Sequence, residues 1–457
     1  MSALREHFKS TPMQCADSRS LPKETAPTPV DLLVVIPHMG PGGAQRVASL
    51  LINHWSGQGI RVAVATLHEK ADAHDLSPAV ARFHISGPQA LRHKGRLTAL
   101  TRDGDSSDQL TAKQRISRSS RRLAAGIALR TLLALNRARK LLIARLLAPI
   151  GMSPTPLMTH QLRRLFRDLE PPLIISFLGT TNIQTVMAAR GLRSKVVISE
   201  RNDPAIQALD EPWEGLRRVI YPKAALVTAN SAGALHTLGS FVPAKKLRQV
   251  ANPLVIPPPP AGMVPHQSRL IAVARLVHQK GLDILLDAFA ELARADEDWM
   301  LDIVGAGPLG SDLQAQALRL GISSRVEFHG HQPSPFPLLY RASVFVLPSR
   351  FEGMPNAMLE AMGCGLAVVA SDASPGPLEF IENNVSGLVV PSEDRSALAQ
   401  ALMRITRNTS LRRRLAQSAR ARVANLDVAT VAKDWETHIQ SLGIDFGLVS
   451  PGFETAP

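Results

Sequence analysis

Cysteine is scarce in this sequence, and long apolar runs are missing. Only Cys15 and Cys364 occur among 457 residues, so neither a disulfide framework nor a cysteine-ligated metal site is supported. No stretch of about 18 apolar residues runs without a charge, which argues against a transmembrane helix. The segment from Met1 to Pro29 contains no apolar run of signal-peptide length. These absences lead us to expect a cytoplasmic chain in a reducing compartment.

Aromatic residues are also few, at 4%, so the core must be mostly aliphatic. Hydrophobic residues at 45% and charged residues at 20% are typical of an ordinary globular protein. A chain of 457 residues exceeds the roughly 250–300 at which single cores stop growing. We therefore expect two domains.

The net charge of +14 is concentrated in one segment. Residues 92–145 contain fourteen Lys and Arg against three Asp, a net charge of +11. Within it, residues 121–147 place apolar side chains on one helical arc and most basic ones opposite. Such a helix suits an anionic membrane interface. The alternative is a helix packed on its own sheet with a solvated basic face.

Short β-branched runs alternate with helix-like segments, the pattern of βαβ units and parallel sheets. A proline-rich break, Pro257 to Pro260, divides the chain into two similar halves. The expected strands are Leu32–Ile36, Val62–Leu67, Arg82–Ile85, Leu173–Phe177, Val196–Ser199 and Leu226–Ala229, then Leu270–Ala274, Met300–Val304, Val326–His329, Val344–Leu347, Ala367–Ala370 and Leu388–Val390. We expect an α/β fold of two Rossmann-like domains whose parallel sheets face each other across a cleft.

The expected divisions of the chain follow from these patterns. They are a disordered tail at 1–30, an N-terminal acceptor-side domain at 31–255 with a basic insertion at 91–157, a linker at 256–266, a C-terminal donor-binding domain at 267–425, a helix returning to the N-terminal domain at 426–445, and a tail at 446–457.

A glycine-rich turn, Gly40 to Gln45, follows the first expected strand and opens a helix. Gly42 and Gly43 let a phosphate approach the backbone, and the helix N-terminus supplies free N–H groups. An anion site is one interpretation. A plain turn is the other, because the spacing is not that of the dinucleotide fingerprint.

Two cations, Arg275 and Lys280, follow the first expected strand of the second half. Open α/β sheets bind ligands just beyond the carboxyl ends of their strands, where such a pair neutralises a diphosphate. Surface cations are common, so the pair indicates a diphosphate site only in combination with the other motifs.

The string from Ser349 to Gly365 contains two carboxylates, Glu352 and Glu360. Glu352 lies in a Gly/Pro turn after an apolar strand, and Glu360 lies about one turn inside the next helix. Each carboxylate can accept hydrogen bonds from a pair of sugar hydroxyls. A solvated Glu plus a Glu that complements the helix dipole would explain either residue singly.

At these motifs the sequence strongly resembles family 4 of the glycosyltransferases, a retaining family of the two-Rossmann GT-B class. The likeness covers about Leu32 to Leu442, and its E-x7-E signature is intact as Glu352 and Glu360. The resemblance implies that the donor diphosphate contacts Arg275 and Lys280, the hexose Glu352 and the ribose Glu360. The full set of implied donor-binding residues is Gly42, Gly43, Arg275, Lys280, Gly330, Glu352, Gly353, Met354, Pro355 and Glu360.

Arg201 departs from the family pattern. Many relatives carry a His after the fifth N-terminal strand, whereas this chain reads Ser199-Glu200-Arg201-Asn202-Asp203. Arginine is no base at neutral pH but binds phosphate or hydroxyl groups, so we assign it to orientation and charge stabilisation. The expected catalytic set is therefore Glu352, Arg201, Arg275 and Lys280.

The resemblance implies a hexose or N-acetylhexosamine transfer from a nucleotide-diphosphate sugar, with UDP favoured, to a lipid-linked or glycan acceptor. We expect no metal and no cofactor, since the D-x-D strings at Asp103 and Asp296 do not follow apolar strands. Two alternatives stay open within the fold class, a nucleotide-sugar epimerase or hydrolase and a sugar phosphorylase. A non-catalytic membrane- or nucleic-acid-binding module is a further alternative, although no nucleic acid partner is expected.

Peripheral association with the inner face of the cytoplasmic membrane follows as a prediction from segment 92–145. Each basic residue near an anionic surface contributes about 1 kcal/mol. The protein should sediment with anionic vesicles and be released by roughly 0.5–1 M salt, where the Debye length approaches ~3 Å. Replacing five cations with Gln should abolish sedimentation yet leave donor binding unchanged: Arg122, Arg130, Arg137, Lys140 and Arg145. Sedimentation of this variant would contradict the membrane interpretation.

Overall fold

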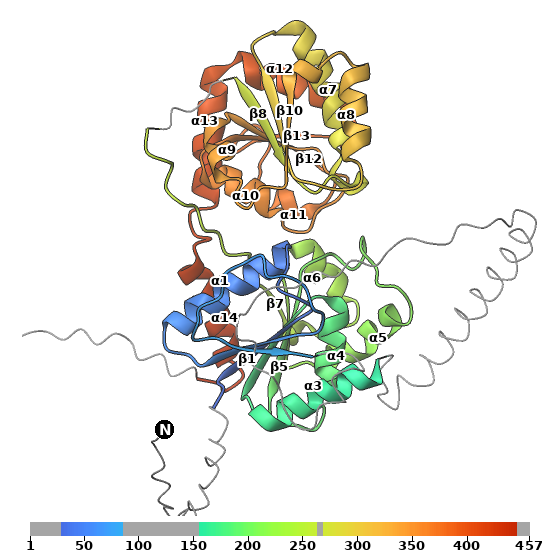
Figure 1. Cartoon of the computed structure of the whole chain (residues 1–457), viewed down its shortest axis with the longest axis vertical. Helices are drawn as coiled ribbons and strands as arrows, with labels where there is room; N and C mark the ends of the chain where they lie inside the picture. Colours follow the sequence, from blue (N-terminus) through green and yellow to red (C-terminus); the bar gives the residue numbers. More distant parts are fainter. Residues whose placement is uncertain (1–28, 86–154, 263–267, 446–457) are drawn as a thin grey trace, which may run out of the picture.

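The computed structural model describes residues 29–85, 155–262 and 268–445. Two α/β units are stacked along the long axis of the molecule (Figure 1), each built on one sheet. Most of the expected N-terminal tail, the basic segment 92–145 and most of its insertion, part of the linker and the end of the chain lie outside the described residues.

The N-terminal domain is built on a seven-stranded parallel sheet with the order β3-β2-β1-β4-β5-β6-β7. Its central strands are runs of apolar residues buried on both faces, as parallel sheets covered by helices require. The strands are β1 (Leu32–Ile36), β2 (Val62–Thr66), β3 (Ala81–His84), β4 (Leu173–Phe177), β5 (Lys195–Glu200), β6 (Leu226–Ala229) and β7 (Leu247–Gln249).

Helices cover both faces of this sheet, so each face has its own apolar cluster. One cluster contains Leu162 and Phe166, and the other contains Trp55. The helices of this part are α1 (Gly43–Gly57), α3 (Pro156–Leu169), α4 (Gly179–Ala189), α5 (Trp213–Ile220) and α6 (Ala232–Gly239). Of the helices that the structure describes in the whole chain, none combines the length and apolarity needed to cross a bilayer.

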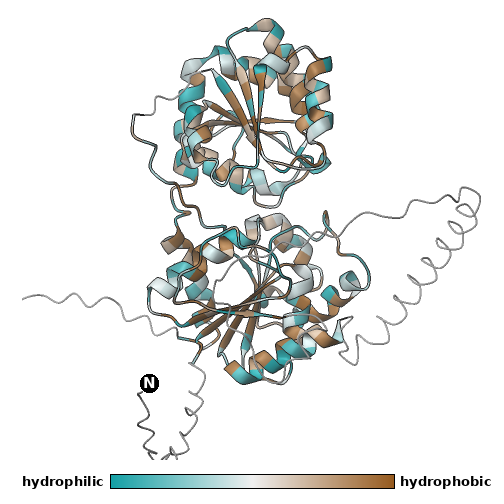
Figure 2. Ribbon diagram, viewed as in Figure 1, coloured by the Kyte–Doolittle hydropathy of each residue, from teal (hydrophilic) through white to brown (hydrophobic). Residues whose placement is uncertain are grey.

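The C-terminal domain is built on a six-stranded parallel sheet with the order β10-β9-β8-β11-β12-β13. Apolar colour concentrates on its strands and polar colour on the outer helix faces (Figure 2). The strands are β8 (Arg269–Val273), β9 (Met300–Val304), β10 (Val326–Gly330), β11 (Val344–Leu347), β12 (Ala367–Ser371) and β13 (Leu388–Val390). The helices are α7 (Leu282–Ala295), α8 (Gly310–Arg319), α9 (Phe336–Arg341), α10 (Asn356–Gly363), α11 (Pro375–Leu378), α12 (Arg395–Arg407) and α13 (Thr409–Arg422).

The final described helix, α14 (Val428–Gln440), packs on the N-terminal domain, beside α1 in Figure 1. Asp427 caps its N-terminus by accepting a hydrogen bond from the Thr430 N–H. Trp435 is fully buried and contacts Trp55 edge to face, with ring centroids 6.4 Å apart. The Trp55 indole N–H donates to Glu436 at 3.0 Å. Residues from the end of the chain therefore complete an apolar cluster of the first domain.

The predicted two-sheet α/β class is confirmed, and each of the twelve expected strands coincides with an observed strand to within one residue at either end. One strand was missed. β7 has the sequence Leu-Arg-Gln, and none of its residues is buried. An edge strand of this length carries no apolar run, so pattern alone could not identify it.

Truncation of Trp435 should destabilise the N-terminal domain. Trp435→Ala is expected to lower the free energy of unfolding by about 3–5 kcal/mol, the usual cost of removing a buried Trp. Urea unfolding measures this loss. Lys433→Ala, at an exposed position of the same helix, serves as the control. A loss below about 1 kcal/mol for Trp435→Ala, the size of an ordinary surface change, would contradict the packing role.

Candidate functional site

A cavity of about 370 Å³ lies where the carboxyl edges of the two sheets meet. Strand order reverses beside β1 and β4 in one sheet and beside β8 and β11 in the other. Ligands of open α/β sheets bind beyond such switch points, because the loops leave in opposite directions there. The cavity is lined by the loops that follow these four strands.

The N-terminal wall of the cavity is the start of α1. Gly42 precedes the helix, and Gly43, Ala44 and Gln45 form its first turn. No side chain caps this helix, and its first turn holds no acidic residue. The free N–H groups and the positive end of the helix dipole therefore face the cavity, an environment that favours negative charge.

Two cations form part of the opposite wall. Arg275 follows β8 and is exposed, and Lys280 ends the short turn before α7. Gly281 is the N-cap residue of α7 and has φ of +62°, and a Cβ there would lie 2.0 Å from the Pro348 carbonyl oxygen. Only glycine fits this close approach, which brings Lys280 next to the loop after β11.

Glu352 lies in that loop and is only 9% exposed. Its carboxylate accepts hydrogen bonds from Lys280 Nζ at 2.6 Å and Ser349 Oγ at 2.7 Å. The Glu352 N–H donates to Ser374 Oγ at 2.9 Å, which fixes the backbone as well. Cation and carboxylate are thus held as a pair at the cavity wall, ready to meet an anion and a polyol respectively.

Glu360 has a different environment, although it belongs to the same sequence string. It is 4% exposed, and its carboxylate contacts the guanidinium of Arg46 from α1. Burial raises the pKa of Glu360 to about 7, while the charge of Arg46 opposes the rise. Glu360 is not among the residues that line the cavity.

Arg201 contributes to the cavity wall, but its guanidinium is packed inside the N-terminal domain. It stacks near Phe177 and Trp435, with its Cζ atom 5.2 and 5.9 Å from the ring centroids. Arg201 Nη1 donates to Asn252 Oδ1 at 2.6 Å. Burial lowers the pKa of the guanidinium to about 9. Direct contact with a substrate stays a prediction, while the observed contact holds Asn252 in place.

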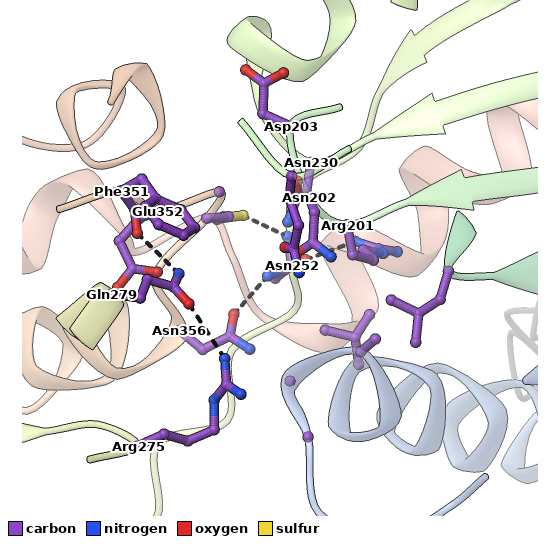
Figure 3. A pocket seen from close by; sticks show the side chains of 18 of the residues that line it. Arg201, Asn202, Asp203, Asn230, Asn252, Arg275, Gln279, Phe351, Glu352 and Asn356 are labelled. Carbon is purple, nitrogen blue, oxygen red and sulfur yellow. Dashed lines mark hydrogen bonds between the residues drawn. The ribbon is translucent and has the colours of Figure 1, made fainter. Parts of the chain in front are cut away.

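Hydrogen bonds cross the cleft beside the cavity (Figure 3). Asn252 Nδ2 donates to Asn356 Oδ1 at 2.6 Å, which joins the segment after β7 to the first residue of α10. Glu379 accepts bonds from the Ala232 N–H and from Gln249 Nε2, each at 2.6 Å. These contacts join the two domains around the cavity.

Most of the residues expected at the site come together. Eight of them line the cavity: Gly42, Gly43, Arg201, Arg275, Lys280, Glu352, Gly353 and Met354. Gly330, Pro355 and Glu360 do not line it. Gly330 is exposed at the end of β10, and Pro355 precedes α10.

Several amide side chains of the cavity were missed by the sequence analysis. Asn230 directly follows β6 and Asn252 follows β7 by three residues, while Asn356 begins α10. Asn230 could have been predicted from the sequence, because it directly follows a strand and therefore lies at the carboxyl edge of the sheet. The pairing of Asn252 with Asn356 depends on the packing of the domains, which sequence pattern does not contain.

One group of metal-ligand type occurs among the described residues, away from the cavity. Asp302, Glu327 and His329 place ligand atoms within 4.8 Å of one another. Arg269 donates to Asp302 at 2.6 Å and to Glu327 at 2.9 Å. Arg269 hydrogen-bonds both carboxylates, and His329 contacts Asp302 at 2.8 Å, so the group is held together by protein side chains.

A comparison with known families identifies the C-terminal part of the chain. Residues 262–422 match the model of a family described as "Glycosyl transferases group 1". These residues include the whole six-stranded sheet and both cavity loops of the second domain.

Two relatives from Campylobacter jejuni cover a larger part of the chain. One is "GalNAc-alpha-(1->4)-GalNAc-alpha-(1->3)-diNAcBac-PP-undecaprenol alpha-1,4-N-acetyl-D-galactosaminyltransferase", 28% identical over 60% of this chain and 76% of its own length. The other is "N-acetylgalactosamine-N,N'-diacetylbacillosaminyl-diphospho-undecaprenol 4-alpha-N-acetylgalactosaminyltransferase", 25% identical over 61% of this chain and 79% of its own length.

Among solved structures, Anabaena HepE in complex with UDP and glucose superposes with a TM-score of 0.66 at 18% identity, covering 90% of this chain and 100% of that one. A sucrose-phosphate synthase from Thermosynechococcus elongatus gives a TM-score of 0.66 at 18% identity, covering 90% of this chain and 99% of that one. At this identity the likeness shows a shared fold.

The raised pKa of Glu360 gives a prediction for stability against pH. Below its ordinary value of 4.5 the carboxyl is protonated in both states; between 4.5 and about 7 the unfolded chain ionises first. The unfolding free energy should therefore fall as pH rises through this window, by about 1–3 kcal/mol relative to Glu360→Gln. Urea titrations at several pH values measure it. An identical pH dependence in both proteins would contradict the assignment.

Proposed function

The chain belongs to the group 1 family of glycosyl transferases and is a retaining glycosyltransferase of GT-B fold, and we propose that it transfers a hexose or N-acetylhexosamine from a UDP-sugar to a lipid-linked glycan. One observation carries the proposal for the donor. Arg275, Lys280 and Glu352 meet the N-terminus of α1 in a single cavity.

The donor diphosphate is proposed to lie between the two cations and the helix start. Arg275 and Lys280 supply formal charge, and Gly42 and Gly43 leave room for phosphate oxygens beside free N–H groups. Glu352, already oriented by Lys280 and Ser349, accepts hydrogen bonds from hydroxyls of the hexose. This arrangement explains why the lysine and the carboxylate lie side by side.

In the transfer step, the bond between the anomeric carbon and the phosphate oxygen breaks while the acceptor oxygen bonds to the same face of the sugar. The acceptor proton passes to the departing phosphate, and the electron pair of the broken bond stays on the nucleoside diphosphate. Lys280, held by Glu352, and the α1 N–H groups are in place before the reaction, so they stabilise the developing charge with little reorganisation, and Arg275 adds its charge from the rim of the cavity. Arg201 orients the site through Asn252.

The finer choice of substrates is supported by the relatives. HepE was solved with UDP and glucose, and both Campylobacter relatives are named as transferases acting on undecaprenol-linked diphosphate glycans. A lipid-linked acceptor fits the proposed membrane association through segment 92–145, which lies outside the described residues. The choice of uridine as the base, and of a hexose or N-acetylhexosamine as the transferred sugar, belongs to this proposal.

Single substitutions in the cavity test the donor site. Arg275→Ala and Lys280→Ala should each lower transfer by about 10²–10³-fold, the usual effect of removing one group that stabilises developing charge. Glu352→Ala should lower transfer by a similar factor, because it removes the acceptor for the hexose hydroxyls and the partner that holds Lys280. The measurement is radiolabelled sugar transfer to an undecaprenol-linked acceptor. A thermal-shift screen of UDP- and GDP-sugars first identifies the donor, since a ligand at ~100 times its Kd adds about 2.7 kcal/mol.

Arg294→Ala is the matched control, because Arg294 is exposed near the far end of α7 and does not line the cavity. It should keep wild-type activity. Near-wild-type transfer by any two of the three cavity variants would refute the donor site. Sugar release from the donor without any acceptor would instead favour a hydrolase or epimerase.

A further inference from the structure

Glu360 does not line the cavity, and its carboxylate pairs with a residue of the other domain. It lies on the second turn of α10, with a side chain 5% exposed. Arg46 lies 314 positions earlier in the chain and reaches across from α1, where its side chain keeps 27% exposure. A buried carboxylate and a half-buried guanidinium thus form an ion pair between the domains.

A second contact fixes the direction of Arg46. Its Cζ atom lies 5.7 Å from the ring centroid of Phe336, the first residue of α9. The guanidinium is therefore bounded by an aromatic ring and a carboxylate, both supplied by the C-terminal domain. On its own domain, Arg46 is tied through its backbone N–H to the Gly42 carbonyl at 3.1 Å.

The inference rests on the proposed donor site and on the role that the family resemblance implies for Glu360, binding of the donor ribose. The ribose hydroxyls and the Arg46 guanidinium then compete for the same carboxylate oxygens. We propose that Arg46 is a selectivity residue for nucleoside diphosphates. Ribose displaces its guanidinium from Glu360, and the displaced guanidinium binds the diphosphate beside the start of α1. A nucleoside alone displaces the cation and offers it nothing in return, so nucleosides are disfavoured.

Arg46 lies close to the cavity in sequence, so the exchange involves neighbouring parts of α1. The residue belongs to the first turns of α1, one residue beyond Gln45 of the cavity wall. In the proposed exchange the Arg46 side chain rotates about its own bonds while the helix stays in place. Arginine suits both partners, because its planar fork matches carboxylate and phosphate oxygens alike.

The competing interpretation is a brace that holds the domains together and has no link to ligand choice. A brace would act equally on every ligand that requires closed domains. The exchange acts differently on ligands with and without phosphates. The ratio of affinities for a nucleoside and its diphosphate separates the two.

Calorimetric titration of the full chain with uridine, UDP, guanosine and GDP provides this ratio. In Arg46→Ala, nucleoside affinity should rise about five- to tenfold, as expected when a charge-assisted competitor is removed. Diphosphate affinity should rise less or fall, so the preference for diphosphate over nucleoside shrinks about tenfold or more. Arg46→Gln, which keeps the side-chain bulk, should shift the ratio in the same direction.

Two controls accompany these variants. Glu360→Gln should change the affinities for nucleoside and diphosphate by the same factor, because both present a ribose and both meet the same loss of the Arg46 pair. Arg61→Ala removes an exposed ion pair with Asp31 at the opposite edge of the sheet and should leave all affinities unchanged. Circular dichroism and melting temperature confirm that each variant is folded.

An unchanged ratio in both folded Arg46 variants, or a weaker nucleoside affinity, would overturn the exchange and leave a brace. Binding of guanosine and GDP but not of the uridine pair would refute the proposed base, and the exchange would then be judged on the guanosine pair. Failure of the wild type to bind any of the four would refute the donor site itself.

Discussion

In an all-parallel sheet every strand ends at the same edge, and in this protein two such edges face each other. The loops that leave these edges at the switch points therefore extend into the cleft. Arg275, Glu352 and the start of α1 therefore meet although they are far apart in sequence. The site can form only because the carboxyl edges of the two sheets face each other. Individual side chains then determine its charge and hydrogen-bonding groups.

Helix α1 links the parts that the cleft brings together. Its first turn forms an uncapped helix end in the cavity, and Arg46 reaches the buried Glu360 of the second domain. Trp55, near its other end, packs against Trp435 of α14. One helix thus connects the cavity wall, the second domain and α14, so a displacement of α1 would alter the contacts at all three.

The sequence allowed the fold and most of the cavity to be predicted, because both depend on local pattern. Apolar runs identified the strands, and glycines with charges after them identified loops such as that of Lys280. The ion pair between Arg46 and Glu360 could not be found in this way, since its partners come from different domains. The buried stacking of Arg201 on Phe177 and Trp435 could not be predicted either, because it depends on the return of α14 to the N-terminal domain.

The return of α14 also has a consequence for biosynthesis. Trp55 and its hydrogen-bond partner Glu436 lie 381 positions apart. At a synthesis rate of ~5–20 residues per second, roughly 20–80 s pass between the emergence of the first and of the second. Throughout that interval the Trp55 face of the nascent N-terminal domain lacks its cover, and a chaperone that shields apolar surface has a defined window in which to act. The second domain is made entirely within this interval, so the first domain is completed only after the second has been synthesised.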